Sequence, residues 1–254
     1  MEKINKKENN NGTESVIQLR KLKKSFGSKE VLKEITMDLF KGENLVVLGK
    51  SGTGKSVAIK CMVGLLVQDN GTATVLGQEV NDLKSDELKE LRAKVGFLFQ
   101  SAALYDSMTV RENLEFPLTR VLKLKDEKEI SDRVNEVLEA VGLLEAKDSM
   151  PSDLSGGMRK RIGLARTLIL KPEIMLYDEP TTGLDPITSR EISELILEMQ
   201  KKYKTSSIII THDMACAEIT ADRILVMNEG RFVAEGTFEE LKNSQETLVR
   251  SFFK

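Results

Sequence analysis

Short apolar runs alternate with segments of helical periodicity along most of the chain. A short apolar run bounded by turn residues is typical of a buried strand, whereas apolar residues three and four apart form one face of a helix. This alternation predicts an α/β fold with a mostly parallel sheet that helices cover on both faces. We expect strands at 16–19, 31–39, 44–48, 72–76, 95–99, 173–177 and 207–210, and helices at 55–66, 126–141, 156–170, 189–202 and 214–219.

Several parts of the chain depart from this alternation. Residues 223–227 and 231–234 flank Asn228-Glu229-Gly230 and predict a β-hairpin, so antiparallel strands are expected at the sheet edges. The stretch 101–157 predicts helices only, with a further short helix capped by Ser85 ahead of it. Residues 1–14 predict a flexible polar tail, and 237–254 an amphipathic helical tail. We therefore expect one domain over 15–236, with an antiparallel β edge subdomain and a helical subdomain at about 101–157.

Composition narrows the class of protein. The 254 residues are 40% hydrophobic and 31% charged, a balance typical of a globular domain. With 38 basic and 40 acidic residues the net charge is −2, which argues against a whole-domain grip on nucleic acid. The longest apolar run, 61–67, is far too short to span a bilayer, and the first residues lack the apolar stretch of a signal peptide. We expect a soluble cytoplasmic protein with two reduced cysteines, Cys61 and Cys216.

A glycine-rich loop follows the expected strand at 44–48. It matches the pattern G-x-x-x-x-G-K-[ST], in which glycines let backbone N–H groups turn inward around phosphate oxygens. The lysine neutralises the β and γ phosphates, the last hydroxyl is offered to Mg²⁺, and the next helix adds its positive N-terminal end. The loop consists of Gly49, Lys50, Ser51, Gly52, Thr53, Gly54, Lys55 and Ser56.

Two adjacent carboxylates end the apolar run at 173–177. The carboxyl ends of parallel strands are where ligands bind in open α/β sheets. We therefore expect Asp178 to hold Mg²⁺, directly or through water, and Glu179 to orient or deprotonate an attacking water. Because side chains alternate along a strand, Glu179 is expected on the other side of the pleat from Asp178.

The sequence Leu154-Ser155-Gly156-Gly157-Met158 opens the helix at 156–170. Ser155 is a good helix cap, and the two glycines expose backbone donors. The segment is either a capped helix start or a second anion site. An anion site here has no partner phosphate within its own subunit, which points to a dimer.

Taken in order, these elements resemble the ATPase subunit of ATP-binding cassette (ABC) transporters. The resemblance covers about residues 15–236 and implies an ABC-type P-loop NTPase fold and ATP hydrolysis with Mg²⁺. It rests on Phe26, the loop GKSGTGKS, Gln100, the signature LSGGM, the run IMLYDE, the turn Gly183-Leu184-Asp185 and His212, the only histidine.

The resemblance also implies a role for each site residue. Phe26, expected in a polar turn at 25–29, would stack on adenine, and Val57 would join the phosphate loop in binding ATP. Gln100 would reach Mg²⁺ and the attacking water, and His212 would contact the γ-phosphate. Two ATPs are sandwiched between two subunits in this family, so each nucleotide would face the partner copy's Ser155, Gly156, Gly157 and Asp185. The implied catalytic set is Lys55, Glu179 and His212, and the implied metal ligands are Ser56, Gln100 and Asp178.

A narrower resemblance lies in residues 98–118, Met158, Asp185-Pro186-Ile187-Thr188 and the C-terminal 248–253. These segments look like the Mla-type lipid-transport ATPases. That group implies a homodimer at the cytoplasmic face of the inner membrane, held there by an integral-membrane permease and working with a membrane-anchored lipid-binding protein of the MCE class. Its C-terminal tail can brace the opposing subunit; a frayed amphipathic helix is the alternative for this segment.

Other functions share part of this pattern. An ATPase of an amino-acid or other small-solute importer has the whole catalytic set and differs mainly at 101–118. An ABC protein acting on DNA or ribosomes usually has two cassettes or a long coiled coil, which 254 residues cannot hold. A P-loop switch with weak hydrolysis would not need Glu179 and the signature. The basic run at 20–33 is a solvated strand face by default, or else a membrane-facing patch or part of a phosphate field.

Overall fold

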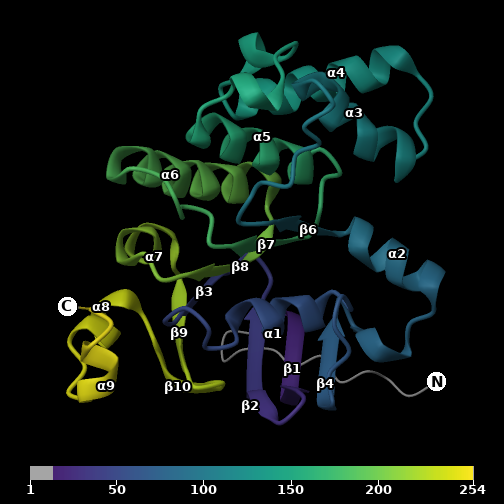
Figure 1. Ribbon diagram of the computed structural model, residues 1–254. Helices are drawn as coiled ribbons and strands as arrows, with labels where there is room; N and C mark the ends of the chain where they lie inside the picture. The colour runs from purple at the N-terminus through teal and green to yellow at the C-terminus, as the bar shows by residue number, and fades with distance from the viewer. Residues whose placement is uncertain (1–13, 254) are drawn as a thin grey trace.

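The computed structural model describes residues 14–253, so all but the last residue of the tail expected at 1–14 lies outside the described part. Its centre is a six-stranded sheet in the order β10-β9-β3-β8-β7-β6 (Figure 1). All neighbouring strands from β9 to β6 are parallel, and β10 pairs antiparallel with β9. The strands are β3 (Asn44–Leu48), β6 (Val95–Leu98), β7 (Ile174–Asp178), β8 (Ser206–Thr211), β9 (Arg223–Asn228) and β10 (Arg231–Gly236).

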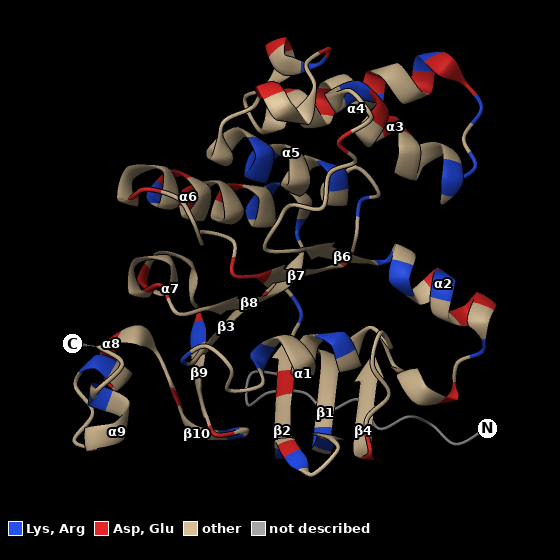
Figure 2. Ribbon diagram, in the orientation of Figure 1, with Lys and Arg blue, Asp and Glu red and all other residues tan. Residues whose placement is uncertain are grey.

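A second, antiparallel sheet lies beside the first, in the order β2-β1-β4-β5. Three of its six basic residues in 20–33 form ion pairs, Arg20 with Asp38, Lys23 with Glu34 and Lys24 with Asp69, which favours the interpretation as a solvated strand face. In Figure 2 charged residues lie on β1 and β2, while the strands of the six-stranded sheet carry few. The strands are β1 (Ser15–Phe26), β2 (Lys29–Phe40), β4 (Asn70–Val75) and β5 (Gln78–Glu79).

Helices surround the six-stranded sheet, with α3, α4 and α5 forming the end of the molecule away from the second sheet (Figure 1). Between β6 and β7 the described chain contains helices only. The α-helices are α1 (Lys55–Met62), α2 (Ser85–Ala93), α3 (Val110–Arg120), α4 (Glu127–Ala140), α5 (Gly156–Leu168), α6 (Pro186–Tyr203), α7 (Met214–Thr220), α8 (Phe238–Lys242) and α9 (Thr247–Arg250); single 3₁₀ turns span Val80–Asp82, Leu144–Ala146 and Pro151–Asp153.

The central sheet is buried on both faces because alternate residues of each strand enter different cores. In β3, Val46 and Leu48 pack with the helices α3 to α7, whereas Leu45 and Val47 pack with α1 and the second sheet. A side-chain period of two explains why these strands are continuously apolar rather than alternating. The predicted α/β fold with a mostly parallel sheet is therefore confirmed.

Some predicted boundaries were wrong for local reasons. Helix α6 begins at Pro186 rather than Ser189, because the Asp185 carboxylate accepts the backbone N–H groups of Ile187 and Thr188 and proline suits the first helical position. Helix α1 ends at Met62 rather than residue 66, because Gly64 takes a left-handed backbone (φ 65°).

Two further predictions need correction. Phe26 is the last residue of β1 rather than part of a turn. Ser85 is the first residue of α2 rather than its cap, and the Glu87 carboxylate accepts the N–H of Lys84 there. The stretch 237–253 contains the two short helices α8 and α9, with Phe253 packed edge-on against Phe238 of the same chain. Within 14–253, no helix has both the length and the hydrophobicity to cross a bilayer.

Candidate active site

The phosphate loop connects β3 to α1 at the carboxyl edge of the central sheet. Gly52 and Gly54 have φ of 79° and 109°, a left-handed backbone that glycine adopts without strain. Gly49 is required for a different reason, since a Cβ there would lie 2.7 Å from the carbonyl oxygen of Met227. The two glycines that the motif specifies, Gly49 and Gly54, are thus needed for the loop's shape, and Gly52 adds a third at a position that the motif leaves open.

Lys55 lies within this loop and is 5% exposed. Its Nζ donates to the carbonyl oxygens of Gly49 at 2.6 Å and Lys50 at 3.1 Å, and lies 3.5 Å from Oε1 of Glu179. Burial lowers the pKa of Lys55, and the Glu179 carboxylate opposes this effect. A buried ammonium group that bonds only loop carbonyls and one carboxylate is suited to attract phosphate oxygens.

Ser56 and Asp178 bring two oxygen ligands together next to the loop. The Ser56 hydroxyl donates to Oδ1 of Asp178 at 2.9 Å, and Asp178 is 9% exposed. Burial raises the pKa of Asp178, and the Ser56 hydrogen bond opposes the shift. Hydroxyl and carboxylate oxygens are the ligands that Mg²⁺ prefers, and a bound cation would offset the cost of burying this carboxylate. The residues present therefore fit a magnesium ion.

Glu179 does not lie where strand alternation placed it. Its φ is 53°, so the chain leaves β7 through a left-handed residue, and both Asp178 and Glu179 face the phosphate loop. The prediction that Glu179 lies on the other side of the pleat was wrong, because that residue no longer has strand geometry.

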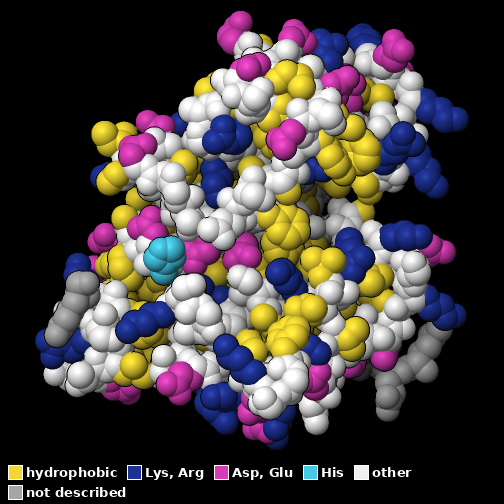
Figure 3. Space-filling model, in the orientation of Figure 1, with side chains coloured by type: hydrophobic (Ala, Val, Ile, Leu, Met, Phe, Trp, Pro, Cys, Tyr) yellow, Lys and Arg dark blue, Asp and Glu magenta, His cyan; other side chains and the backbone are white. Residues whose placement is uncertain are grey.

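His212 follows β8, the neighbour of β7, and therefore meets Glu179 at the sheet edge. The distance from His212 Nδ1 to Oε2 of Glu179 is 2.7 Å, and the hydroxyl of Thr182 donates to the same oxygen at 3.3 Å. The histidine is exposed and is the cyan side chain in Figure 3. The Glu179 carboxylate thus lies between Lys55 and His212, where an acceptor of protons could act on a water at a phosphate.

A cavity of about 390 Å³ collects the predicted nucleotide-binding residues from both sheets. Phe26 comes from the second sheet and is 48% exposed. Its ring is therefore accessible for stacking against a flat aromatic group such as a nucleotide base. The lining residues are Phe26, Lys29, Val31, Ser51, Gly52, Gly54, Lys55, Ser56, Val57, Gln100 and Glu179.

The signature residues do not line that cavity. Ser155 caps α5 by accepting the Met158 N–H at 3.2 Å, and Gly156 lines a smaller cavity of about 190 Å³ beside Gln100 and Leu184. One chain therefore does not bring Ser155, Gly156, Gly157 and Asp185 to its own phosphate loop. Their predicted contact with nucleotide stays a prediction.

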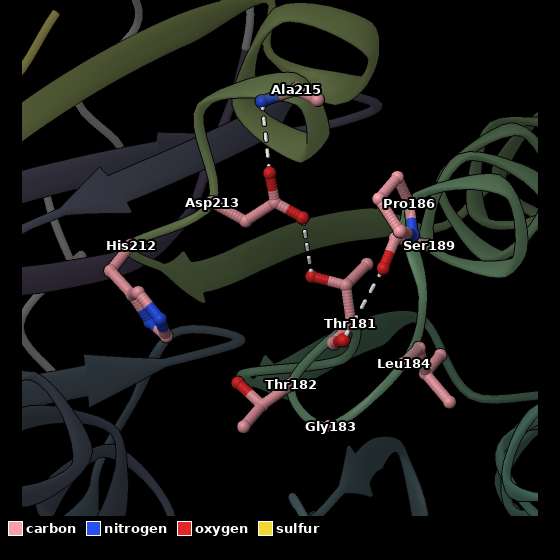
Figure 4. Close-up of a pocket in the computed structure, with 9 residues that line it drawn as sticks. All are labelled: Thr181, Thr182, Gly183, Leu184, Pro186, Ser189, His212, Asp213 and Ala215. Carbon is pink, nitrogen blue, oxygen red and sulfur yellow. Dashed lines mark hydrogen bonds between the residues drawn. The ribbon is translucent and has the colours of Figure 1, made fainter. Parts of the chain in front are cut away.

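Residues that sequence reasoning missed surround His212. A second cavity of about 390 Å³ lies between the turn at 181–186 and α7 (Figure 4). The Thr181 hydroxyl donates to Oδ2 of Asp213 at 2.9 Å, while the other Asp213 oxygen accepts the Ala215 N–H at 3.0 Å (Figure 4). Asp213 thus caps α7 and ties it to the end of β7. Both residues adjoin recognised motifs, which is the only signal that could have found them.

Lys160, in α5, was also missed. It is 6% exposed, and its Nζ lies 2.5 Å from the carbonyl oxygen of Gln100 and 3.4 Å from that of Glu179. Burial lowers the pKa of Lys160, and the carboxylates of Glu179 and Asp178 oppose the shift. No sequence signal marks this residue, because its partners are backbone atoms that every residue has.

A family model described as "ABC transporter" matches residues 32–182, more than half of the chain. The chain belongs to the ABC transporter ATP-binding family. It is an ATPase whose hydrolysis of ATP is coupled to transport, with ATP and Mg²⁺ as its cofactors.

Curated relatives of this ABC ATPase have different names. It is 41% identical over 236 residues to the probable ribonucleotide transport ATP-binding protein mkl of Mycobacterium leprae, covering 93% of this chain and 68% of that one. It is 40% identical to protein trigalactosyldiacylglycerol 3, chloroplastic, of Arabidopsis thaliana, covering 95% and 74%. It is 36% identical to the methionine import ATP-binding protein MetN of Rhizobium etli, covering 94% and 66%.

Solved structures place the fold in the same family. CbiO1 of Clostridium perfringens, part of the ABC transporter complex cbiONQ, superposes with a TM-score of 0.84 at 29% identity and covers 94% of this chain and 95% of that one. The ATP-binding cassette MJ0796, solved as a dimer bound to ADP and phosphate, superposes with a TM-score of 0.79 at 30% identity and covers 87% and 98%.

Proposed function

We propose that this chain is the ATP-hydrolysing subunit of a transporter that moves phospholipids or related lipids between membranes through a partner permease. The ATPase part rests on one observation, the Glu179 carboxylate held between Lys55 and His212 next to the Ser56–Asp178 pair. The lipid part rests on the resemblance at 98–118 and on a relative at 40% identity that bears the name of a galactolipid.

In the proposed reaction the Lys55 ammonium group exchanges its hydrogen bonds with the Gly49 and Lys50 carbonyl oxygens for hydrogen bonds with phosphate oxygens. Ser56, Asp178 and Gln100 hold Mg²⁺, which when bound neutralises phosphate charge and orients the phosphates for in-line attack. Glu179 orients the attacking water and accepts its proton. His212 fixes the Glu179 carboxylate through the 2.7 Å contact and contacts the γ-phosphate.

The site is proposed to be completed by a second copy of the chain. Ser155 caps α5 and is exposed, Gly156 is half-buried and Gly157 is buried. The N-terminal end of a helix attracts anions. In a homodimer these residues and Asp185 face the nucleotide of the partner copy, with Phe26 stacked on adenine. The relative solved as a dimer with ADP and phosphate supports this arrangement.

The partners are proposed to be an integral-membrane permease and a membrane-anchored MCE-type lipid-binding protein, with no nucleic acid. The permease would contact the segment after Gln100, where Tyr105 and Phe116 have ring centroids 5.0 Å apart and Arg166 lies 4.7 Å over the Tyr105 ring. Tyr105 is 40% exposed, so aromatic surface is available for such contact. The subunit would then lie at the cytoplasmic face of the inner membrane.

The second candidate function is ATP hydrolysis for an importer of amino acids or other small solutes. The relative named as a methionine import protein, at 36% identity, favours it. Both candidates share the catalytic set, so the protein partners distinguish them.

The test uses Glu179→Gln, which keeps the side-chain shape and removes the proton acceptor. We expect this variant to bind ATP and dimerise on it while losing turnover. The matched control is Glu173→Gln, just before β7 at the end away from the site, and it should retain turnover. The Glu173 carboxylate forms an exposed ion pair with Lys94 at 3.9 Å and lies outside the phosphate-loop cavity. Parental turnover in Glu179→Gln would refute the mechanism.

The same variant identifies the transporter. It is purified by affinity from detergent-solubilised membranes, and mass spectrometry identifies its protein partners and bound lipids. A permease with an MCE-type protein and co-purifying phospholipid would support lipid transport. A permease with a small-solute binding protein and no lipid enrichment would contradict it and favour import.

A further inference from the structure

One face of α5 contacts the loop that follows β6 at three places. Lys160, Gly163 and Arg166 are spaced three residues apart and so lie on one side of the helix. Lys160 bonds the Gln100 carbonyl, and Nη1 of Arg166 donates to the Ala103 carbonyl at 2.6 Å. Between them Gly163 lets the loop approach, since a Cβ there would lie 2.8 Å from Cβ of Ala102. Helix α5 thus contacts the loop at Gln100, Ala102 and Ala103.

Lys160 differs from the other two because it also reaches the end of β7. Its Nζ lies 3.4 Å from the Glu179 carbonyl oxygen as well as 2.5 Å from that of Gln100. Across residues 14–253 it forms no ion pair with a carboxylate, although it is 6% exposed. Burial of an ammonium group costs free energy unless hydrogen bonds replace its hydration. We therefore infer that the two carbonyl oxygens are the groups that stabilise this buried charge.

Both segments that Lys160 joins have an unfavourable backbone. Ala102 and Ala103 have φ of 60° and 50°, and Glu179 has φ of 53°. Residues with a Cβ pay for a left-handed backbone, and such conformations persist only where neighbouring groups hold them. At Glu179 the carbonyl oxygen has a second donor, the Thr182 N–H at 3.3 Å. A cation bonded to both carbonyls would therefore maintain the positions of both segments.

We propose that Lys160 is a positioning residue that joins the backbone of Gln100 to the backbone of Glu179, so that both side chains keep their places around the phosphates. The proposal rests on the roles proposed above for Gln100 and Glu179. Displacement of a reacting group by about 1 Å can lower turnover by about 100-fold. Lys160 does not line the cavity that contains Phe26 and the phosphate loop, so we expect its effect in turnover rather than in ATP binding.

The test compares steady-state ATPase kinetics and thermal unfolding of the full-length protein. Lys160→Met fills the same space without the charge or the donors. We expect its kcat to fall at least about tenfold and its KM for ATP to stay within about twofold. Its Tm should stay close to the parental value, because removal of a buried charge offsets the loss of its two hydrogen bonds. Lys160→Arg keeps a cation with several donors and should have a kcat between those of the parent and the Met variant.

Lys201→Met is the matched control, because Lys201 is exposed in the last turn of α6 and lies outside the site. It should leave kcat unchanged. The proposal is overturned if Lys160→Met keeps the parental kcat, if its loss appears as an equal rise in KM, or if both Lys160 variants lose stability or fail to fold, since the lysine then only supports the fold.

Glu179→Gln in the same assay separates this inference from the proposed function. Parental turnover in Glu179→Gln would refute the catalytic role of Glu179, and with it the reason for positioning that residue. Loss of turnover in Glu179→Gln together with parental turnover in Lys160→Met would refute the positioning role alone.

Discussion

We expect loss of the hydrogen bond between Thr181 and Asp213 to lower both the stability of the protein and the turnover that depends on the adjacent His212. Thr181→Val keeps the side-chain shape and removes the hydroxyl that donates to Oδ2 of Asp213 at 2.9 Å. Thr181 is 4% exposed, whereas Asp213 is only partly buried and can take up water in place of the lost donor. Hydrogen bonds to charged groups contribute about 1.5–3 kcal/mol, so with rehydration we expect the free energy of unfolding to fall by about 1–2 kcal/mol.

Two measurements check this expectation. For a chain of this size 1 kcal/mol shifts the Tm by about 2–4 °C, so circular dichroism should show a fall of about 2–8 °C. Without this hydrogen bond Asp213 is held less firmly, and so is the adjacent His212. We therefore expect kcat for ATP hydrolysis to fall by about 3–10-fold, which corresponds to a rise of about 0.7–1.4 kcal/mol in the activation free energy.

Thr181→Ser is the control, because it keeps the hydroxyl and loses a buried methyl group. It should retain most of the turnover and lose at most about 1 kcal/mol of stability. If Thr181→Val unfolds at the parental temperature and turns over normally while Thr181→Ser loses stability, methyl packing rather than the hydrogen bond is what Thr181 contributes.

Two further predictions concern the rest of the fold. Burial raises the pKa of the Cys61 and Cys216 thiols to about 11, so at pH 8 the thiolate fraction is about 200-fold below that of an ordinary cysteine. At pH 8 Ellman's reagent should react with neither thiol in the folded protein and with both after denaturation, and the reaction should become faster as the pH rises toward 11. Rapid labelling of the folded protein at pH 8 would contradict this. At Gly230 (φ 79°) an added Cβ would overlap the carbonyl oxygen of Val31, so Gly230→Ala should lower the free energy of unfolding by about 2–4 kcal/mol. The control Gly77→Ala, with φ 77° and nothing within 4 Å, should cost only about 1–2 kcal/mol, and equal losses of Tm would show that backbone strain alone explains Gly230.

Much of the site could be predicted from the sequence because its parts are local. The phosphate loop is recognised from the spacing between Gly49 and Ser56, because the backbone N–H groups and side chains that would bind phosphate all lie within these eight residues. Asp178 and Glu179 end an apolar strand, and the position of His212 after the next strand places it at the same sheet edge. Parallel strands share one carboxyl edge whatever their order, so the pattern places these residues at that edge. Tertiary packing decided that β8 lies between β3 and β7, which brings His212 next to Glu179 and the loop.

Other features depended on residues distant in the chain. Tertiary contacts decided that β3 lies between β8 and β9, and that Phe26 reaches the phosphate loop from a different sheet. The left-handed backbone at Glu179 overrode the alternation that placed it across the pleat. Helix α6 began three residues early because the Asp185 cap and Pro186 outweighed the apolar periodicity that suggested Ser189.

The sequence by itself determined the class of fold, the phosphate loop and the acidic strand end, because periodicity and short motifs act over a few neighbouring residues. Only the tertiary structure decided which backbone groups Lys160 bonds, and that Thr181 holds Asp213. The physical reason is that every residue carries the same backbone carbonyl and many carry hydroxyls. Which of them meets a buried charge is decided when distant segments pack together, and composition and spacing do not record that choice.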